Sequence, residues 1–141
     1  MLEERNCGDL LKQIHDEMEK QANNMLRSQD LTMAQVGALL ALNQTNEKKM
    51  PLKDLERWLH VAQSTAAGIA SRLEQKGLVE AFGDPTDKRI KMLRITSSGI
   101  ACSKTAEKNM MAAEQELLSG LTEAEQTIFK TLLLKVRNSL K

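Results

Sequence analysis

The sequence has few of the residues that build metal and catalytic sites. Its two cysteines, Cys7 and Cys102, lie far apart without metal-ligand spacing. Its two histidines, His15 and His60, are isolated from each other and from any carboxylate motif. A nucleophile–base pair and a phosphate-cradling glycine loop are also missing. The sequence therefore predicts no metal, no cofactor and no catalytic residue, and it argues against an enzyme.

Long apolar runs are lacking too. The longest strongly apolar stretch, Val36 to Leu42, is too short to cross a bilayer. The first five residues show neither the basic region nor the apolar core of a secretory signal. We therefore expect a cytoplasmic protein without membrane contact. The 141 residues, 41% hydrophobic and 28% charged, fit a single globular domain with a buried core.

Neither sign of charge dominates, and aromatic residues are scarce. The formal net charge of +1 argues against polyanion binding over the whole surface, although basic residues clustered on one face can still bind.

Eight methionines accompany two phenylalanines, one tryptophan and no tyrosine. Such residues allow adaptable packing. Met18, Met25 and Met110 are predicted either to be core residues, their usual role, or to line a pliable pocket.

Apolar residues at helical spacing mark amphipathic helices at both ends of the chain. The N-terminal stripe is Leu10, Leu11, Ile14, Met18, Ala22 and Met25. After Gly99 the stripe is Cys102, Ala106, Met110, Ala113 and Leu117, and a capping box of Thr122 and Glu125 begins a last helix with Ile128, Leu132, Val136 and Leu140. This is more apolar surface than one chain needs to cover, so residues 1–28 and 100–141 are predicted to form a homodimer interface.

The middle of the chain predicts three short helices. A capping box of Thr32 and Gln35 begins a helix that runs to about Thr45. Pro51 suits the first turn of a second helix, which carries Leu52, Leu55 and Leu59, and we expect Trp58 to pack beside these leucines. The third helix runs from about Ala62 to Lys76. It ends there because Gly77 can take the left-handed position and Leu78 can fold back onto Leu73.

The pattern changes between Val79 and Thr96. Two short apolar segments flank a turn at residues 83–87, which predicts a β-hairpin. A helix pair followed by such a hairpin is typical of a winged helix-turn-helix. The predicted fold is therefore mainly α with a small β-hairpin wing (α+β). Its winged lobe spans residues 31–99.

The third of these short helices is the candidate for reading a major groove. Gln63 can present an amide to adenine, Ser64 and Thr65 can bond bases or phosphate, and Arg72 can clamp a phosphate. The same side is expected to continue through Ala67, Gly68 and Ser71. A glycine inside a helix costs about 1 kcal/mol against alanine, so Gly68 indicates close contact with DNA or with a neighbouring helix. The ordinary alternative is that the polar residues are capping or solvated side chains.

The hairpin is locally basic. Lys88, Arg89, Lys91 and Arg94 outnumber the acidic residues Glu80, Asp84 and Asp87. A basic hairpin of this kind can enter a minor groove of DNA or contact its phosphates. Asp87 is two residues before Arg89 and is predicted to orient its guanidinium, the alternative being a simple surface ion pair.

Four segments together resemble the MarR family. They are residues 55–59 (LERWL), 72–79 (RLEQKGLV), 84–89 (DPTDKR) and 93–99 (LRITSSG). The resemblance is close over about residues 31–99, and the flanking helices match in placement and length. The sequence departs from the family at Ala62, where a serine or threonine cap is frequent, and at Gly68, where a longer polar residue is frequent.

The resemblance implies a homodimer whose terminal helices interlock and whose two recognition helices enter successive major grooves of a pseudo-palindromic DNA operator. It places Arg89 at the wing tip in the minor groove. It also implies a transcription regulator, commonly a repressor, that releases double-stranded DNA on binding a small, often phenolic, aromatic effector or on oxidation of a cysteine. Double-stranded DNA is thus the expected partner. The alternative is a winged-helix protein-interaction module without specific DNA binding, which the near-neutral charge favours.

Cys7 lies just before the first predicted helix, close to where peroxide-sensing relatives carry a reactive cysteine. Those sensors resemble one another in tyrosines that hydrogen-bond the thiol, and this chain has no tyrosine. Cys102 is expected to be a buried, inert thiol.

Overall fold

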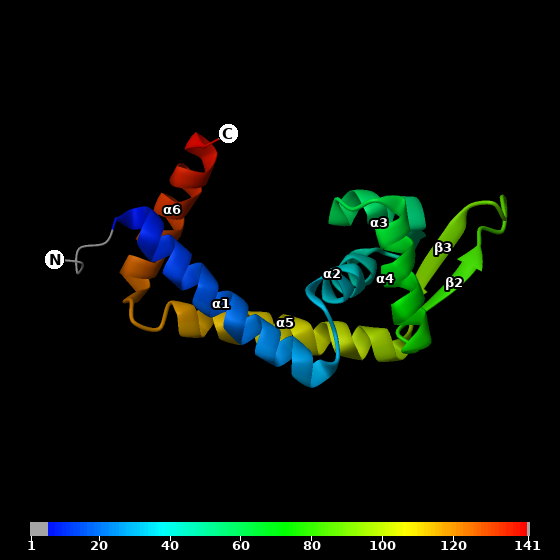
Figure 1. Ribbon diagram of the computed structural model, residues 1–141, viewed down its shortest axis with the longest axis horizontal. Coiled ribbons are helices and arrows are strands. Elements are labelled where there is room, and N and C mark those ends of the chain that lie inside the picture. The colour runs from blue at the N-terminus through cyan, green and yellow to red at the C-terminus, as the bar shows by residue number, and fades with distance from the viewer. Residues whose placement is uncertain (1–5, 141) are drawn as a thin grey trace. The chain divides into compact units, whose positions relative to one another are not determined.

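The computed structural model describes residues 6–140 (Figure 1). It contains two compact units, of which the first ends at Glu107 and the second begins at Lys108, inside helix α5. The elements are α1 (Cys7–Gln29), α2 (Met33–Gln44), β1 (Lys49–Pro51), α3 (Leu52–Leu59), α4 (Gln63–Gln75), β2 (Val79–Gly83), β3 (Lys91–Ile95), α5 (Ser97–Leu117) and α6 (Glu123–Ser139). The mainly α fold with a β-hairpin wing is confirmed.

Both predicted capping boxes are present. At the start of α2 the Gln35 amide donates to Thr32 Oγ1 and the Thr32 amide donates to Gln35 Oε1, each at 3.2 Å. Thr122 and Glu125 form the same reciprocal pair at the start of α6. Asn6 caps α1 by accepting from the Asp9 amide, so Cys7 is the first residue of that helix and not a residue before it.

The end of α4 follows the predicted left-handed turn. Gly77 has φ of +74°, and the Leu78 amide donates to the Leu73 carbonyl at 2.9 Å. The Thr96 hydroxyl then donates to the Gly77 carbonyl at 2.7 Å and accepts from the Gly99 amide at 3.1 Å. One threonine thus joins the end of α4 to the start of α5.

The sheet has three antiparallel strands in the order β1-β3-β2, one more than the predicted hairpin. The missed strand β1 pairs Met50 with Leu93 and Pro51 with Met92. It is three residues long and includes a proline, so it shows too little alternation to be recognised from sequence. It adds an edge strand next to the predicted wing, where a proline is tolerated.

The core of the first unit lies where α2, α3, α4 and the sheet meet. Its fully buried leucines are Leu39, Leu42, Leu55, Leu73 and Leu93. Burial of each such side chain is worth about 2 kcal/mol. Trp58 does not join them: it is 57% exposed, so its predicted packing beside the α3 leucines is wrong. Leu55 and Leu59 lie four residues apart and share the inner face of α3, whereas Trp58 is rotated about 100° away from Leu59.

The two terminal helices contribute little to the core within this chain, although Leu26 of α1 packs against it. Neither α1 (Cys7–Gln29) nor α6 (Glu123–Ser139) contains a buried residue. Met18, Met25 and Met110 are exposed and are therefore not core residues of the single chain. Within residues 6–140, no helix is both long and apolar enough to cross a membrane.

Candidate nucleic-acid interface

Helix α4 presents a polar side to solvent. Its N-cap Ala62 makes no side-chain cap, so the polar residues that follow are not explained by capping. The exposed residues on this side are Gln63, Ser64, Thr65, Gly68, Ser71 and Arg72. Among residues 6–140 no side-chain hydrogen bond or ion pair engages Gln63, Ser64, Thr65, Ser71 or Arg72. Their donors and acceptors remain available to an external partner.

Two small residues of α4 differ in their surroundings. Ala67 is half-buried and packs against the hydrophobic core, so it is not part of the exposed side that the sequence predicted. Gly68 is exposed, and a Cβ built there would meet nothing within 4 Å. Contact with a neighbouring helix in the described chain therefore does not explain Gly68.

The wing turn is built around the Asp84 carboxylate. Oδ2 of Asp84 accepts from the amides of Thr86 and Asp87, each at 3.2 Å, and from the Thr86 hydroxyl. These bonds, led by the Thr86 hydroxyl, lower the pKa of Asp84. The negative charge of Asp84 is thus used to order the turn.

Asp87 and Arg89 form the predicted pair, with a defined geometry. Arg89 Nε donates to Asp87 Oδ1 at 3.1 Å, and a terminal guanidinium nitrogen donates to Oδ2 at 3.2 Å. The Arg89 amide donates to Oδ1 as well, at 3.1 Å. The hydrogen bonds from Arg89 lower the pKa of Asp87. Lys88, between the two paired residues in the sequence, and Lys91, two residues after Arg89, are both exposed.

Further contacts that the sequence did not reveal position the wing against α4. Glu74, near the end of α4, accepts a hydrogen bond from the Ala81 amide of β2 at 3.1 Å. On the same hairpin the Arg94 guanidinium lies 4.5 Å from the centre of the Phe82 ring. The helix and the hairpin accordingly lie side by side (Figure 1). Local spacing does not predict these two contacts. The partners in each, Glu74 with Ala81 and Phe82 with Arg94, are too far apart along the chain.

Lys76 anchors the other flank of α4. Its ammonium donates to the Asp30 carbonyl and to Gln35 Oε1, the latter at 3.2 Å. It therefore ties the end of α4 to the start of α2. The ammonium of Lys76, the C-cap of α4, is therefore engaged by the lobe itself.

Sequence comparisons match this winged lobe. The model of the MarR family matches residues 31–91. The MarR multiple antibiotic resistance protein of Escherichia coli is 28% identical over 130 residues, which are 92% of this chain and 89% of that protein. The transcriptional regulator YwaE of Bacillus subtilis is 31% identical over 80 residues, 57% of this chain and only about half (47%) of its own length.

Solved structures give the same result over nearly the whole chain. MepR, a transcription regulator of a multidrug efflux pump of Staphylococcus aureus, has a TM-score of 0.84 at 27% identity, and the match covers 97% of this chain and all of that one. MepR in complex with DNA has a TM-score of 0.77 at 28% identity, covering 96% and 99%. BpsR of Bordetella bronchiseptica, whose DNA binding is regulated by 6-hydroxynicotinic acid, has a TM-score of 0.72 at 25% identity, covering 94% of each chain.

The chain contains a MarR-family domain at residues 31–91. As a MarR-family winged-helix protein it is a DNA-binding transcription regulator and not an enzyme. The polar side of α4 and the ordered wing are the parts of this MarR-family lobe with the chemistry to contact a nucleic acid.

The remaining candidate groups of this MarR-family protein are isolated. Cys7 is exposed, and Cys102 is partly buried beside the core instead of fully buried. His15 lies 3.4 Å from Glu19 on the surface of α1, and His60 caps the end of α3. Residues 6–140 contain no group of three or more potential metal ligands.

Proposed function

We propose that the chain is a cytoplasmic, homodimeric repressor that binds a pseudo-palindromic operator and is controlled by a small aromatic effector. The DNA-binding part rests on one observation, the combination of two features on the same lobe. Helix α4 has a polar side that makes no side-chain hydrogen bonds within the described chain, and the wing holds Arg89 in place. In this proposal residues 31–99 are the DNA-binding lobe of a single MarR-like domain, 1–141. Residues 1–28 and 100–141 form the dimer interface.

Helix α4 is the reading element of the proposal. Gln63 offers an amide that pairs with an adenine edge, and Ser64 and Thr65 offer hydroxyls to bases or phosphates. Gly68, which is exposed and has no Cβ, allows the helix to approach the DNA closely. Ser71 and Arg72, a turn later, are placed for the phosphate backbone.

The wing is the anchoring element. Arg89 enters the minor groove, Asp87 orients its guanidinium, and Lys88 and Lys91 bind the flanking phosphates. The Asp84 turn supports this role because an ordered loop loses less conformational entropy on binding.

The terminal helices support a homodimer. Apolar side chains stand exposed along α1, including Leu10, Leu11 and Ile14, and along α6, including Ile128 and Leu132. Contiguous apolar surface of this kind marks an interaction site. A two-fold dimer presents two α4 helices, which matches the two half-sites of a pseudo-palindrome.

Effector control and repression have their own support. The similarity to BpsR, whose DNA binding is regulated by 6-hydroxynicotinic acid, supports a small aromatic effector. Repression follows where the operator overlaps a promoter, because the bound dimer and the polymerase exclude each other.

The test is DNA binding measured by fluorescence anisotropy across a salt series. The DNA is a site selected by the protein from a random pool, with a scrambled duplex for comparison. We expect affinity for the selected site to fall steeply as salt rises, because counterions are released on binding. Arg89→Ala should weaken binding by about 1–3 kcal/mol, whereas Arg57→Ala on α3, outside both proposed interfaces, should not change it. A protein that selects no site at low salt would overturn the proposal in favour of a protein-interaction module.

A further inference from the structure

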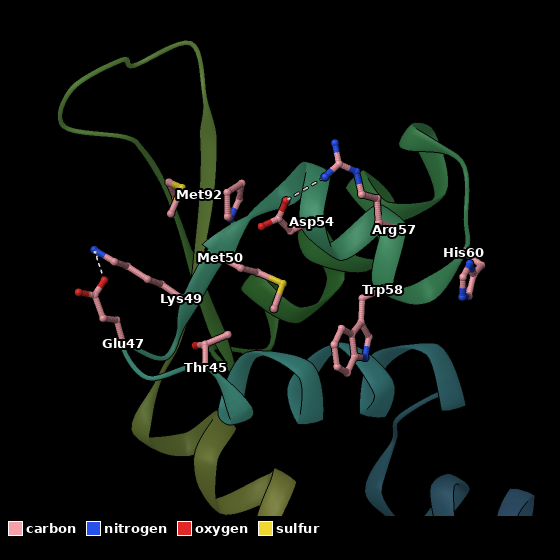
Figure 2. Close-up of a pocket in the computed structure, with 10 residues that line it drawn as sticks. Thr45, Glu47, Lys49, Met50, Asp54, Arg57, Trp58, His60 and Met92 are labelled. Carbon is pink, nitrogen blue, oxygen red and sulfur yellow. Dashed lines mark ion pairs between the residues drawn. The ribbon is translucent and has the colours of Figure 1, made fainter.

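The wing hairpin is supported by the rest of the sheet along only part of its length. On one side it pairs with β1, but this pairing ends where Pro51 meets Met92. Figure 2 shows the hairpin continuing past Met92 and away from helix α3. The part beyond this point, residues 83–91, contains the turn and Arg89. The position of the wing tip therefore depends on how the hairpin is held on its other side, next to α4.

The other side of the hairpin is the free edge of β2. The Thr96 amide donates to the Leu78 carbonyl at 3.0 Å, at one end of the β2–β3 ladder. At the other end the Asp84 amide donates to the Ile90 carbonyl at 2.9 Å. Bonded pairs recur at every second residue of an antiparallel ladder, so the amide of Ala81 points outward, away from β3. An amide on a free edge needs another acceptor.

Glu74 supplies this acceptor from the last turn of α4. Its Oε2 accepts from the Ala81 amide at 3.1 Å, across the turn at Gly77. Gly77, with φ of +74°, is the point at which the angle between α4 and β2 can change most easily. The Glu74–Ala81 bond lies where the hairpin leaves the core, because Val79 is buried, Ala81 is half-buried and Gly83 is exposed. It therefore restrains the wing at the point where burial stops restraining it.

Two more carboxylates continue the support to the wing tip. Asp84 accepts from the amides of the turn, and Asp87 holds the Arg89 guanidinium. Glu74, Asp84 and Asp87 all stand on the two elements proposed to contact DNA, where a negative charge opposes binding to phosphates. Their contribution to binding therefore lies in the donor groups that they hold in place.

We propose that Glu74 is a positioning residue that fixes the distance between the major-groove contact of α4 and the minor-groove contact of Arg89. About five residues separate Ala81 from the wing tip, which is about 17 Å at about 3.3 Å per residue. A rotation of about 10° at Ala81 moves the tip by about 3 Å, close to one base-pair step of about 3.4 Å. The operator is accordingly a half-site with an A·T-rich minor groove at one fixed distance from it. This inference rests on the proposed function.

The distance is measured with duplexes that keep the selected half-sites. Their flanks are G·C pairs except for a short A·T tract, placed at the selected position or displaced by one base pair. A·T tracts narrow the minor groove and attract arginine. By anisotropy the wild type should prefer the aligned tract about tenfold, and Glu74→Ala should reduce this preference to about threefold or less. A loss of stability alone lowers both affinities equally and leaves their ratio unchanged.

Two matched variants separate the hydrogen bond from the charge. Glu74→Gln removes the charge but keeps an oxygen that accepts from the Ala81 amide, so the preference should stay within about twofold of the wild type. Glu80→Ala removes a negative charge from an exposed position of β2 and should leave the preference unchanged. The inference is overturned if Glu74→Ala keeps the preference, if Glu74→Gln loses it, or if Glu80→Ala lowers it equally.

The Glu74–Ala81 bond is also measured without DNA. Hydrogen exchange of the Ala81 amide, followed by nitrogen–proton NMR, should be at least about tenfold faster in Glu74→Ala than in the wild type. The Ile95 amide, which donates to the Lys48 carbonyl at 3.0 Å, should exchange at an unchanged rate. Equal exchange of Ala81 in both proteins would overturn the inference.

The same measurements distinguish failure of this inference from failure of the proposed function. Arg89→Ala should remove the preference for the aligned tract, because Arg89 is the group that the tract attracts. A protein that binds DNA with a tract preference dependent on Arg89 but not on Glu74 would overturn the role of Glu74 alone. A protein with a protected Ala81 amide that binds no DNA would overturn the proposed function, and the role of Glu74 in DNA binding with it.

Discussion

Asp87 holds Arg89 by two parallel hydrogen bonds, 3.1 Å and 3.2 Å long, at the tip of a wing whose turn is ordered by Asp84. The Arg89 side chain nevertheless remains 92% exposed. A surface ion pair of this kind adds little to stability. Its effect is to hold the Arg89 guanidinium in one orientation, whereas a free arginine side chain samples many rotamers.

We predict that Asp87→Asn lowers sequence selectivity more than overall affinity. Removing the carboxylate frees the Arg89 guanidinium and deletes a negative charge near the phosphates, so affinity for scrambled DNA should rise. The ratio of selected-site to scrambled-site affinity should fall about tenfold, part of the value of an arginine contact. Anisotropy on both duplexes measures the ratio. Asp54→Asn on α3, which removes another carboxylate paired with an arginine, is the control. A ratio for Asp87→Asn equal to that of the wild type would show that Asp87 does not orient Arg89 for DNA.

The wing turn should lose its order only in acid. The pKa values of Asp84 and Asp87 are lowered by hydrogen bonds from Thr86 and Arg89 respectively. A group with a depressed folded-state pKa contributes its stabilisation fully above its ordinary pKa, near 3.9 for aspartate, and loses it as the pH falls through the lowered value. The Thr86 and Arg89 amide signals, followed by NMR from pH 6 to pH 2, should therefore titrate with midpoints below about 3.9. Midpoints at or above this value would contradict the hydrogen-bonding scheme.

Gly68→Ala should separate stability from function. A Cβ at this position meets nothing within 4 Å, so alanine should raise the free energy of unfolding by about 0.5–1 kcal/mol in urea denaturation. If DNA approaches the helix here, the same methyl group should weaken binding at least about threefold by anisotropy. Asn24→Ala, at an exposed position of α1, is the control. It also raises helix propensity, but it adds no methyl group to α4. A stabilised Gly68 variant with unchanged DNA affinity would remove Gly68 from the interface.

Gly99→Ala should destabilise the lobe. A Cβ on Gly99 would overlap the Leu78 carbonyl oxygen and lie 2.6 Å from Ile95 Cγ1, so the start of α5 has to move away from the sheet. We expect a loss of about 3 kcal/mol in the free energy of unfolding. Gly120→Ala, where a Cβ meets nothing within 4 Å, should change it by less than about 0.5 kcal/mol. Equal stabilities of the two variants would rule out tight packing at Gly99.

Leu132→Glu should weaken the proposed dimer. Leu132 is exposed on α6 of the single chain, and a charge placed in an apolar interface loses its hydration. Sedimentation should show a dimer dissociation constant at least about tenfold higher, corresponding to about 1.4 kcal/mol. Thr131→Glu introduces the same charge one position away on α6 as a comparison. A monomeric wild-type protein, or two variants with equal dissociation constants, would contradict this interface.

Local chemistry determined much of this protein. The capping boxes at Thr32 and Thr122 and the left-handed turn at Gly77 depend on residues within a few positions of one another. Such signals are readable because a short peptide already contains both partners of each bond. The hairpin was readable too, because the alternation on both sides of residues 83–87 is a local pattern. The predicted fold class and the candidate residues on α4 and the wing followed from these elements.

The sequence by itself thus determined which segments form the helices and the hairpin, and most of the residues that α4 and the wing offer to solvent. Only the tertiary structure decided that Lys49–Pro51 joins the sheet, that Ala67 turns toward the core and that Gly68 has open space beside it. It also decided that Trp58 stays outside and that Glu74 and Lys76 tie α4 to its neighbours. These features are set by segments distant in sequence, because burial and pairing depend on which surfaces meet after the chain has folded.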